Sequence, residues 1–406
     1  MVSTRFAVAN SLVLALVACG ASPPSVQSAP VQVPVAVAVT PVAASVPPAP
    51  PASPSGPNSQ GPSNSLSAAD AELRAAGVAH LDAGRFQDAE RAFAAILSRN
   101  PGNAATTALY ETARKLLADS QRSATRSLAN VTPTRIGAAP MVHTVVRPVS
   151  ALPLPAPRLV KRRELKNGIT DDAAWFAKGQ FKTPELKVPN PFMREGGDLP
   201  AGMPTRFGSL LLVSALDHGD HFVLIFGRDF SDGHVVAVLG SDLALRALFD
   251  FGAWQSVPNI QKGAESFVGE SVNYAIVKDD VLYVQNGHRT YAASSGGKNA
   301  FLSALDVKTG ELLWRSQPLV ANASNFVLHG SHIFAGYGFT AEPDFMFVLE
   351  RATGAVTSRV PVASGPSAVI EKDGALFVRT YDHDYVFAIE EGVKQAHRAT
   401  APLERR

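Results

Sequence analysis

The sequence predicts a mainly β fold built from repeated antiparallel units, preceded by a small α-helical hairpin. From residue 208 onward, short apolar runs rich in Val, Leu, Phe and Tyr alternate with Asp-Gly, Asp-Asp and Lys-Thr-Gly turns. No helical periodicity separates these runs, so we expect antiparallel strand hairpins. Residues 67–117 show apolar positions three and four residues apart, which is typical of amphipathic helices.

Composition excludes several classes of protein. The 406 residues carry 37 Lys and Arg against 35 Asp and Glu, a net charge of +2. Such a balanced chain has no basic field for nucleic acid, and we expect no nucleic-acid partner. A single cysteine excludes intrachain disulfides, a zinc ribbon and a CxxC redox pair.

That cysteine, Cys19, ends an N-terminal segment with one basic residue, Arg5, and an apolar run from Leu12 to Val17. The run is too short for a transmembrane helix and indicates an export signal. Leu16 to Cys19 resemble the lipobox of bacterial lipoproteins. The resemblance implies that residues 1–19 form the signal peptide and lipobox, that Cys19 is lipidated, and that the protein is an outer-membrane lipoprotein facing the periplasm. Exposure at the cell surface stays open, and so does an ordinary secretory signal with a chance cysteine.

Residues 20–66 contain no charged side chain and many prolines. This composition favours an extended chain without regular secondary structure, so we expect a disordered tether between the membrane and the folded part.

Residues 67–120 are predicted to form a helical hairpin and a third helix that begins after Asn103. The first two helices resemble a tetratricopeptide repeat. The positions that carry this resemblance are Leu73, Gly77, Ala89, Phe93 and Pro101. Because such repeats usually occur in arrays, two interpretations stay open: a docking or spacing unit, and a site that recognises a peptide.

Residues 121–206 read as a proline-rich linker and wrapping segment. Within it, residues 170–206 are expected to lie against the folded body through Trp175, Phe176, Phe181 and Phe192. The linker contains one strong charge cluster, made of Arg158, Lys161, Arg162, Arg163 and Lys166. We interpret the cluster as a solvated linker, with contact to anionic lipid or an acidic partner as the alternative.

Residues 207–399 contain an internal repeat. The segment 301–314 recurs as 345–358, an offset of 44 residues, and turn positions divide the region into four units of about 40 to 60 residues. This is the period of a propeller blade. The predicted architecture is therefore an antiparallel propeller or partial propeller of about four to five blades.

The repeat resembles the pyrroloquinoline-quinone-like propeller repeats. The residues that match their signature are Ala304, Asp306, Thr309, Gly310 and Trp314. Asp306 and Thr309 can hydrogen-bond the turn backbone, Gly310 can adopt positive φ, and Trp314 can pack between blades. Members of that family commonly have seven or eight blades. A small ring, a series completed by residues 170–206 and one completed by a second protomer therefore stay open.

No catalytic motif accompanies these repeats. Quinoprotein dehydrogenases of similar fold use adjacent cysteines and a calcium site, and this chain lacks the cysteine pair. Residues with metal-ligating side chains occur at His218, Asp220, His221, Asp229, Asp232 and His234 and again at Asp382, His383 and Asp384. We interpret both groups as turn residues and predict no metal and no cofactor. The glycine-rich piece Ser294 to Lys298 precedes no helix and is read as a loop.

The sequence thus favours a non-catalytic interaction scaffold with a membrane anchor at Cys19 and a protein partner. A propeller that binds or senses a small molecule or metal is the alternative, and a quinoprotein-type oxidoreductase is the remote one. A scaffold would use the helical hairpin and outer blade edges, whereas a ligand binder would direct polar side chains to the propeller axis.

Overall fold

The structure is a computed structural model that describes residues 66–150, 155–167, 172–188, 197–200, 202–229, 232–255, 270–288 and 290–391. Cys19, its lipobox, residues 20–65 of the expected tether and Phe192 lie outside the described residues. Lipidation and tether disorder therefore stay predictions.

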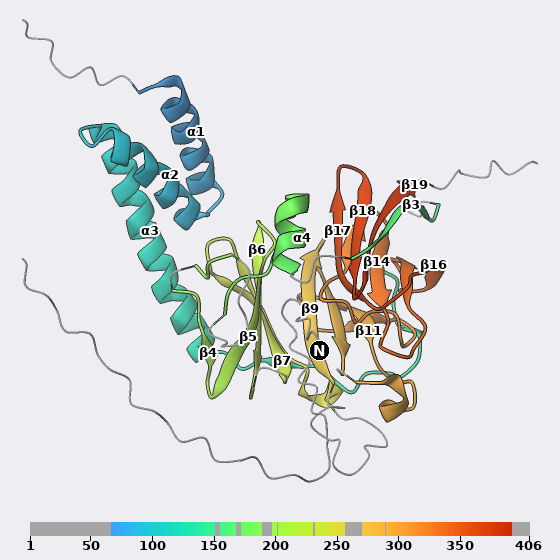
Figure 1. Ribbon diagram of the computed structural model, residues 1–406. Coiled ribbons are helices and arrows are strands. Elements are labelled where there is room, and N and C mark those ends of the chain that lie inside the picture. Colours follow the sequence, from blue (N-terminus) through green and yellow to red (C-terminus); the bar gives the residue numbers. More distant parts are fainter. Residues whose placement is uncertain are drawn as a thin grey trace, which may run out of the picture. The chain divides into compact units, whose positions relative to one another are not determined.

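Three helices open the described part of the chain (Figure 1): α1 (Ala68–Asp82), α2 (Phe86–Arg99) and α3 (Ala104–Ala129). The side chain of Ser67 caps α1 by accepting a hydrogen bond from the Asp70 amide at 3.1 Å, and Asn103 caps α3 by accepting one from the Thr106 amide at 2.9 Å. Such caps satisfy amides that have no partner within the helix. None of the described helices is long and apolar enough to cross a membrane.

The helical hairpin is closed by a buried acid. The Asp70 carboxylate, 4% exposed as a residue, accepts hydrogen bonds from Arg99 Nε at 3.0 Å and Asn100 Nδ2 at 2.9 Å. These bonds tie the start of α1 to the end of α2 and hold the pKa of Asp70 below its usual range. Between the helices, a Cβ at Gly77 would lie 2.6 Å from Cε1 of the fully buried Phe93.

The boundary expected at residue 120 falls inside α3, which continues to Ala129. The last turns of this helix carry the buried Leu128, which packs into the core beside the first sheet. Tertiary packing therefore extends a helix whose own sequence becomes polar after Leu117.

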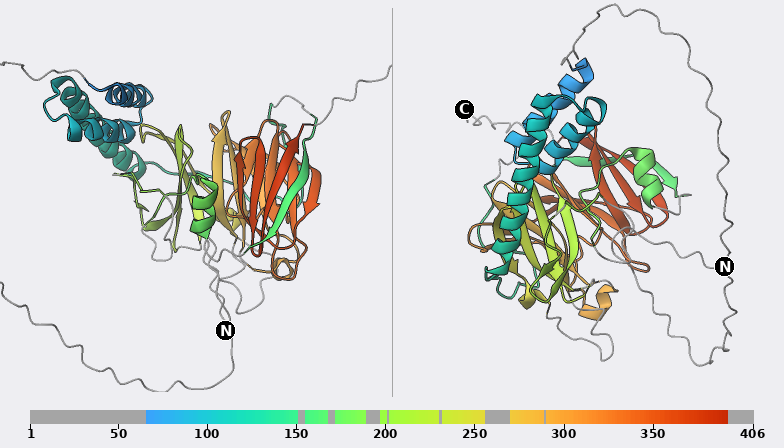
Figure 2. Two further views of the ribbon diagram at one scale, coloured as in Figure 1. Left: turned by 45° about the horizontal axis from the view of Figure 1, so that its top comes forward. Right: turned by 90° about the vertical axis from the view of Figure 1, so that its left-hand side faces the viewer.

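Four mainly antiparallel sheets follow, each formed mainly by consecutive strands, and we call them blades 1 to 4 (Figures 1 and 2). Blade 1 contains β5 (Leu210–Asp217), β6 (His221–Gly227), β7 (Gly233–Gly240) and β8 (Leu245–Asp250), with β4 (Arg206–Phe207) and β1 (Thr134–Arg135) at its edges. Blade 2 contains β9 (Ser271–Lys278), β10 (Val281–Gly287), β11 (Phe301–Asp306) and β12 (Leu312–Arg315), with β2 (Thr144–Val145) at its edge. Blade 3 contains β13 (Val327–His329), β14 (His332–Tyr337), β15 (Phe345–Glu350) and β16 (Val356–Pro361). Blade 4 contains β17 (Pro366–Lys372), β18 (Ala375–Thr380), β19 (His383–Glu390) and β3 (Arg158–Lys166). This arrangement confirms the predicted mainly β, propeller-like fold with a small helical hairpin.

The region expected to be a linker supplies strands to three of the blades, which corrects the predicted boundary at residue 207. β1 and β2 join the edges of blades 1 and 2, and β3 pairs with β19 over its whole length. The basic cluster thus lies on an edge strand of blade 4. Its exposed charges and the bulge opposite Val386 and Phe387 are features that protect an edge strand from pairing with other chains.

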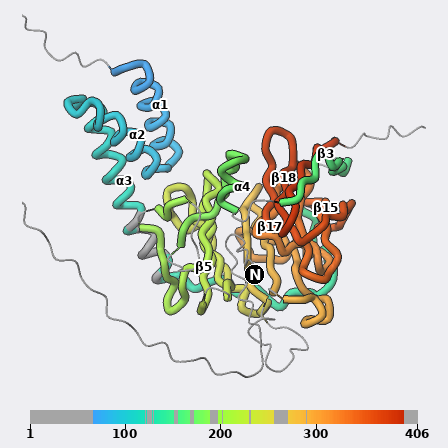
Figure 3. The backbone as a smooth tube through the Cα atoms, viewed as in Figure 1, coloured from blue at the N-terminus to red at the C-terminus, as the bar shows by residue number. Residues whose placement is uncertain are grey.

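Apolar residues join neighbouring blades. One core contains Ile225 of blade 1, Leu282 of blade 2 and Ile333 of blade 3. A second contains Phe334 of blade 3 and Val378 of blade 4. The blades are therefore packed against one another through their faces. Figure 3 shows the path of the chain through the blades, from β5 to β18.

The first and last blades each have a face that no further blade covers within the described residues, and other segments cover it. On blade 1, Leu128 of α3 and the segment residues Leu186 and Met203 form a core with the sheet. On blade 4, the short helix α4 (Asp172–Gly179) leads to Phe181, whose ring centroid lies 4.9 Å from that of Phe377. This covering of terminal units is what a short repeat array needs for stability.

Candidate functional site

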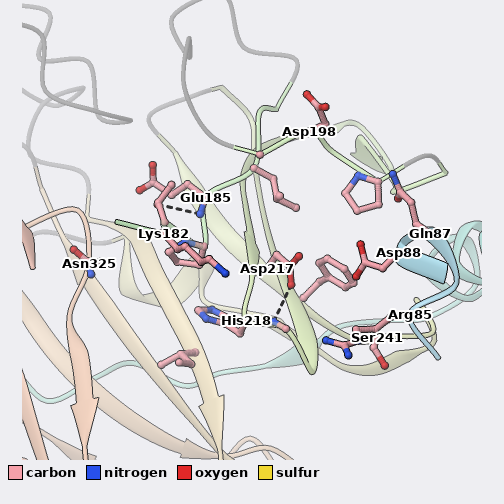
Figure 4. Close-up of a pocket in the computed structure, with 18 of the residues that line it drawn as sticks. Arg85, Gln87, Asp88, Lys182, Glu185, Asp198, Asp217, His218, Ser241 and Asn325 are labelled. Atoms are coloured by element: carbon pink, nitrogen blue, oxygen red, sulfur yellow. Dashed lines mark hydrogen bonds between the residues drawn. The ribbon is translucent and has the colours of Figure 1, made fainter. Parts of the chain in front are cut away.

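All four blades contribute to one pocket with a volume of about 690 Å³ (Figure 4). The first strands of blades 2, 3 and 4 are β9, β13 and β17, and each is an edge strand of its sheet that lines this pocket. The end of β5, the segment from Lys182 to Leu186 and the beginning of α2 complete the lining. The volume lies within the usual range for sites that hold a small molecule or part of a peptide.

Apolar side chains line the blade side of the pocket. They include Ile276 from β9, Phe326 and Leu328 at β13, and Ile370 from β17. Their contribution from three different blades explains why no single stretch of sequence shows the pocket.

One wall of the pocket is polar and well buried. Glu185 is 7% exposed, and Tyr274 of β9 is 4% exposed. Burial, together with the negative charge of Glu185, raises the pKa of Tyr274 far above its ordinary value, so this phenol stays neutral.

Backbone pairing places Glu185 on that wall. Glu185 forms an antiparallel bridge with Leu216 of β5, the Leu186 amide donates to the Ala215 carbonyl at 2.8 Å, and the Asp217 amide donates to the Pro184 carbonyl at 2.7 Å. Residues 184–186 therefore act as a short extra strand on β5. Figure 4 shows Lys182, Glu185, Asp217 and His218 on this side of the pocket.

Two histidines next to this wall hold blade 1 to blade 2. His218 Nε2 lies 3.0 Å from the Ala275 carbonyl, and the Val277 amide donates to His221 Nε2 at 3.1 Å. His221 Nδ1 lies 2.6 Å from Asp220 Oδ1, and the two imidazole rings stack at 4.9 Å. The two side chains thus imitate the donor and acceptor that a neighbouring strand would offer to β9.

These contacts determine the tautomers. His218 must carry its proton on Nε2 to donate to a carbonyl, and His221 must carry its proton on Nδ1 to accept at Nε2. Burial, with a smaller effect from His221, lowers the pKa of His218 to about 4. At neutral pH the ring is uncharged, and Nδ1 of His218 is a bare acceptor.

Blades 3 and 4 are joined by one amide. Nδ2 of Asn325 donates to the Val369 carbonyl at 2.6 Å, and the Val369 amide donates to Asn325 Oδ1 at 2.9 Å. Asn325 is 8% exposed. Its side chain therefore serves as a second strand edge for β17.

Blades 2 and 3 are joined through Trp314. The indole is fully buried, and its Nε1 donates to the Arg351 carbonyl of blade 3 at 3.0 Å. Gly354 packs so closely against the indole that a Cβ there would overlap the ring. Of the repeat signature, Ala304 pairs with Trp314 across β11 and β12.

The remaining signature residues form the turn before β12. Asp306 Oδ1 accepts from the amides of Lys308 at 2.9 Å and Thr309 at 3.0 Å, and Gly310 has φ of 72°. Thr309 Oγ1 accepts from the Glu311 amide at 3.2 Å. In the second copy of the repeat, Val348 pairs with Ser358, which therefore occupies the position of Trp314.

The other signature residues lie in the helical hairpin and away from the pocket lining. Ala89 and Phe93 are buried in α2, while Leu73 is half-buried in α1, and Pro101 follows the end of α2. The pocket is reached instead by Arg85, Gln87 and Asp88 at the start of α2.

The structure engages the candidate metal ligands in hydrogen bonds with other groups or in pairs with one another. Asp232 binds Arg228 and its carbonyl lies 2.8 Å from His234 Nδ1, and Asp384 lies 3.3 Å from Arg379. Asp382 accepts from Ser364 and from His383 Nδ1 at 2.8 Å. Across the part of the chain that the structure describes, no group of three or more His, Cys, Asp or Glu side chains is arranged to hold a metal ion.

His288 and Ser295 in blade 2 form a hydrogen-bonded pair whose role is structural. The Thr290 amide points at His288 Nδ1 from 3.4 Å, so Nε2 carries the proton and donates to Ser295 Oγ at 2.7 Å. Ser295 donates in turn to the Ala292 carbonyl at 3.2 Å. Burial lowers the pKa of His288 to about 4. A serine nucleophile would need the opposite proton direction, with the histidine accepting from the serine.

Sequence reasoning missed Glu185, Tyr274 and Asn325. Glu185 lies in a segment that was read only as wrapping, and Tyr274 and Asn325 belong to blade units in which no spacing marks the inward strand. For Tyr274 and Asn325, a usable signal was the position in or next to the first strand of a blade, because first strands face the pocket.

The sequence matches no protein-family model and no curated protein. Among solved structures, the chain is similar to the computationally designed Ika4 protein (12% identity, TM-score 0.28, 50% of this chain and 96% of that chain). It is also similar to BamB from Moraxella catarrhalis (16% identity, TM-score 0.21, 45% of this chain and 70% of that chain). The comparison with a chain of a mitotic checkpoint complex gives 11% identity and a TM-score of 0.27. It covers 45% of this chain and 60% of that chain. Because these TM-scores are low, the fold is described here from the order and register of the strands.

Proposed function

We propose that this protein is a membrane-tethered interaction protein without catalytic activity of its own, and that its central pocket holds a segment of a partner protein. The observation that carries the proposal is the pocket lining. Edge strands from blades 2, 3 and 4, the end of β5 and the beginning of α2 meet around one cavity of about 690 Å³. A partner segment there would contact every part of the fold at once.

The anchor in this proposal rests on the sequence. Leu16 to Cys19 resemble a lipobox, and Cys19 is the single cysteine of the chain. A diacylated cysteine with an acylated amine supplies the two signals that stable membrane attachment requires. The proposed location is the outer membrane, with the folded part facing the periplasm, and the helical hairpin is proposed to be a tetratricopeptide-like unit.

Site-specific photocrosslinking tests the partner. A photoreactive side chain is placed at Ile370 or Leu328 in the pocket, and at Tyr381, which is 62% exposed and does not line the pocket. We expect both pocket positions to capture the same protein, identified by mass spectrometry, and Tyr381 not to capture it. A pattern that is the same at all three positions would contradict the assignment of the pocket.

The anchor has a separate test. Replacing Cys19 by Ala should move the protein from the membrane fraction to the soluble fraction after cell fractionation. If the variant stayed with the membrane, lipidation at Cys19 would be excluded as the means of attachment. Turnover of a substrate by the purified protein would contradict the non-catalytic proposal.

A further inference from the structure

We propose that the partner segment in the pocket binds as an extended strand along the inner edge of β13, with backbone hydrogen bonds to Leu328 and with uncharged, apolar side chains. The inner edge is the side of each first strand that faces away from the second strand of its blade. This inference rests on the proposed function and specifies the conformation and the chemistry of the segment.

The register of each blade shows which backbone groups point to the inner edge. In blades 2, 3 and 4 a two-residue turn joins the first two strands, and the turn is closed by a hydrogen-bonded pair: Lys278 with Val281, His329 with His332, and Lys372 with Ala375. Hydrogen-bonded and non-hydrogen-bonded positions alternate along an antiparallel pair. The amide and carbonyl of the residue before each closing pair therefore face the inner edge. These residues are Val277, Leu328 and Glu371.

The bonds observed on β9 and β17 agree with this alternation. On β9, two histidine side chains bond the Val277 amide and the Ala275 carbonyl. On β17, one asparagine side chain bonds both the amide and the carbonyl of Val369. On β5 of blade 1, residues 184–186 pair with the strand. Other parts of the chain therefore already occupy places on the inner edges of these three strands.

The inner edge of β13 differs because it is open. No hydrogen bond joins the Leu328 amide or carbonyl to another residue that the structure describes, and the same holds for Phe326, two residues earlier. Both residues line the pocket. On β17 the backbone of Glu371 has no such bond either, but the asparagine at Val369 blocks the next place. A free strand edge presents donors and acceptors that pair with an extended peptide. The pocket therefore offers a strand-shaped segment its best backbone partner at β13.

Apolar side chains flank the open edge on both sides. Leu328 packs against the core shared with blade 2, and Val327 packs against the core shared with blade 4. Ile276 of blade 2 and Ile370 of blade 4 line the pocket. Successive side chains of a strand point to opposite faces, so the segment would direct its side chains alternately toward blade 2 and blade 4. Apolar side chains suit both directions.

The charged side chains next to this edge are already engaged. His329 Nδ1 of β13 lies 2.9 Å from Glu371 Oε1 of β17, and Lys372 Nζ donates to the Gly179 carbonyl at 3.0 Å. A charged side chain on the segment would lose water beside Leu328 without gaining a free counter-ion, which is costly in a partly apolar pocket. An uncharged segment matches this part of the lining.

Isothermal titration of the full-length protein with capped peptides tests the proposal. The parent probe is the acetylated and amidated pentapeptide Ser-Val-Val-Val-Ser. Its analogue carries an N-methyl group on each valine, which removes backbone donors and keeps the side chains. We expect the analogue to bind about tenfold more weakly, the factor that one or two backbone hydrogen bonds contribute. Equal affinities, or no measurable binding of the parent peptide, would overturn the proposal.

Two further peptides test the side-chain chemistry. In one the central valine is replaced by lysine, and in the other by glutamate. We expect both to bind about tenfold more weakly than the parent peptide, because neither charge finds a free partner beside β13. Tighter binding of either charged peptide would show that the uncharged segment is wrong.

Two variants at one position locate the binding edge. Leu328→Pro removes the amide that faces the inner edge, and it spares the pairing with β14 because that amide takes no part in it. Leu328→Val keeps the amide and an apolar side chain. We expect Pro to weaken binding of the parent peptide about tenfold and Val to have a clearly smaller effect. Equal effects with unchanged thermal melts would overturn the proposal. If the Pro variant did not fold, the N-methyl comparison on the unaltered chain would still decide.

Photocrosslinking at Ile370 separates this inference from the proposed function. If the unaltered chain and the Leu328→Pro variant captured the same protein equally well, the strand pairing would be wrong and the proposed function would stand. If the peptides showed the expected order of affinities while no protein was captured, the proposed partner would fail and the binding edge on β13 would stand.

Discussion

The joint between blades 1 and 2 and the joint between blades 3 and 4 perform the same task with different chemistry. In both, side chains take the place of a neighbouring strand at an edge of β9 or β17. Asn325 makes both bonds to Val369 with one amide. The first joint divides the same two bonds between His218 and His221, which contact Ala275 and Val277.

The difference is that the amide has no proton to gain or lose near neutral pH, whereas the joint between blades 1 and 2 depends on a neutral His218 imidazole. Protonation of His218 would place a buried cation in a ring that stacks on His221 at 4.9 Å. The joint of blades 1 and 2 is therefore the one that acid can open. Because His218 lines the pocket, opening that joint also alters the pocket lining.

The largest expected effect lies at the third joint, between blades 2 and 3, which serves as a reference. Trp314→Ala removes a fully buried indole and its bond to the Arg351 carbonyl. Large-to-small changes of this kind cost about 3–5 kcal/mol. We expect that loss in the free energy of unfolding from denaturant titration, with the same value at pH 7 and pH 5. An unchanged melt would mean that Trp314 does not hold the blades together.

Asn325→Ala should have the next largest effect. It leaves the amide and the carbonyl of Val369 without partners in a buried joint, at a cost of roughly 2–3 kcal/mol. The loss should be independent of pH between 5 and 8. Asn325→Asp is the sharper variant, since its carboxylate would face the Val369 carbonyl and should destabilise more than Ala at pH 7. If Asp were tolerated as well as Asn, the two-bond joint would be wrong.

Acid should act on the joint between blades 1 and 2. The folded pKa of His218, about 4, lies below its ordinary value of 6.5, so the unfolded chain takes up the proton first. Stability is then highest above pH 6.5 and is lost as pH falls toward 4, by roughly 2 kcal/mol at pH 5.

Two glutamine variants separate this effect from other titrations. His218→Gln can still donate to Ala275 but cannot titrate, so it should remove that part of the acid sensitivity. His143→Gln, an exposed position, is the matched control and should retain it. Equal pH profiles for the two variants would exclude His218 as the acid-sensitive group.

The sequence allowed the blades to be predicted but left the joints hidden. The turn from Asp306 to Gly310 and the Trp314 position follow from residues within one hairpin, so a local pattern was enough. Asn325 and Val369 are 44 residues apart, and His218 and Ala275 are 57 apart. No local pattern predicts which backbone groups of a distant strand a polar side chain will reach. β3 was missed for another reason: its charges belong to an edge strand, and exposed basic residues hid the strand periodicity.

The same reasoning limits what could be known of the pocket. Glu185 reaches the wall because residues 184–186 pair with β5, which lies more than twenty residues later in the chain. Its place on the wall depends on that pairing, and its charge acts on Tyr274 from another blade. The acid therefore had no distinguishing feature until the blades were assembled.

The smallest effect is expected inside a blade, where no joint is crossed. Asp306→Ala removes two hydrogen bonds to the amides of Lys308 and Thr309 in an exposed turn. Water can replace the lost acceptor there, so the cost should be about 1 kcal/mol, below that of Asn325→Ala. Since the turn does not contact His218, the acid sensitivity measured by denaturant titration at pH 7 and pH 5 should not change. A loss as large as that of Trp314→Ala would show that the turn, and with it the register of β11 and β12, determines the position of the indole between blades 2 and 3.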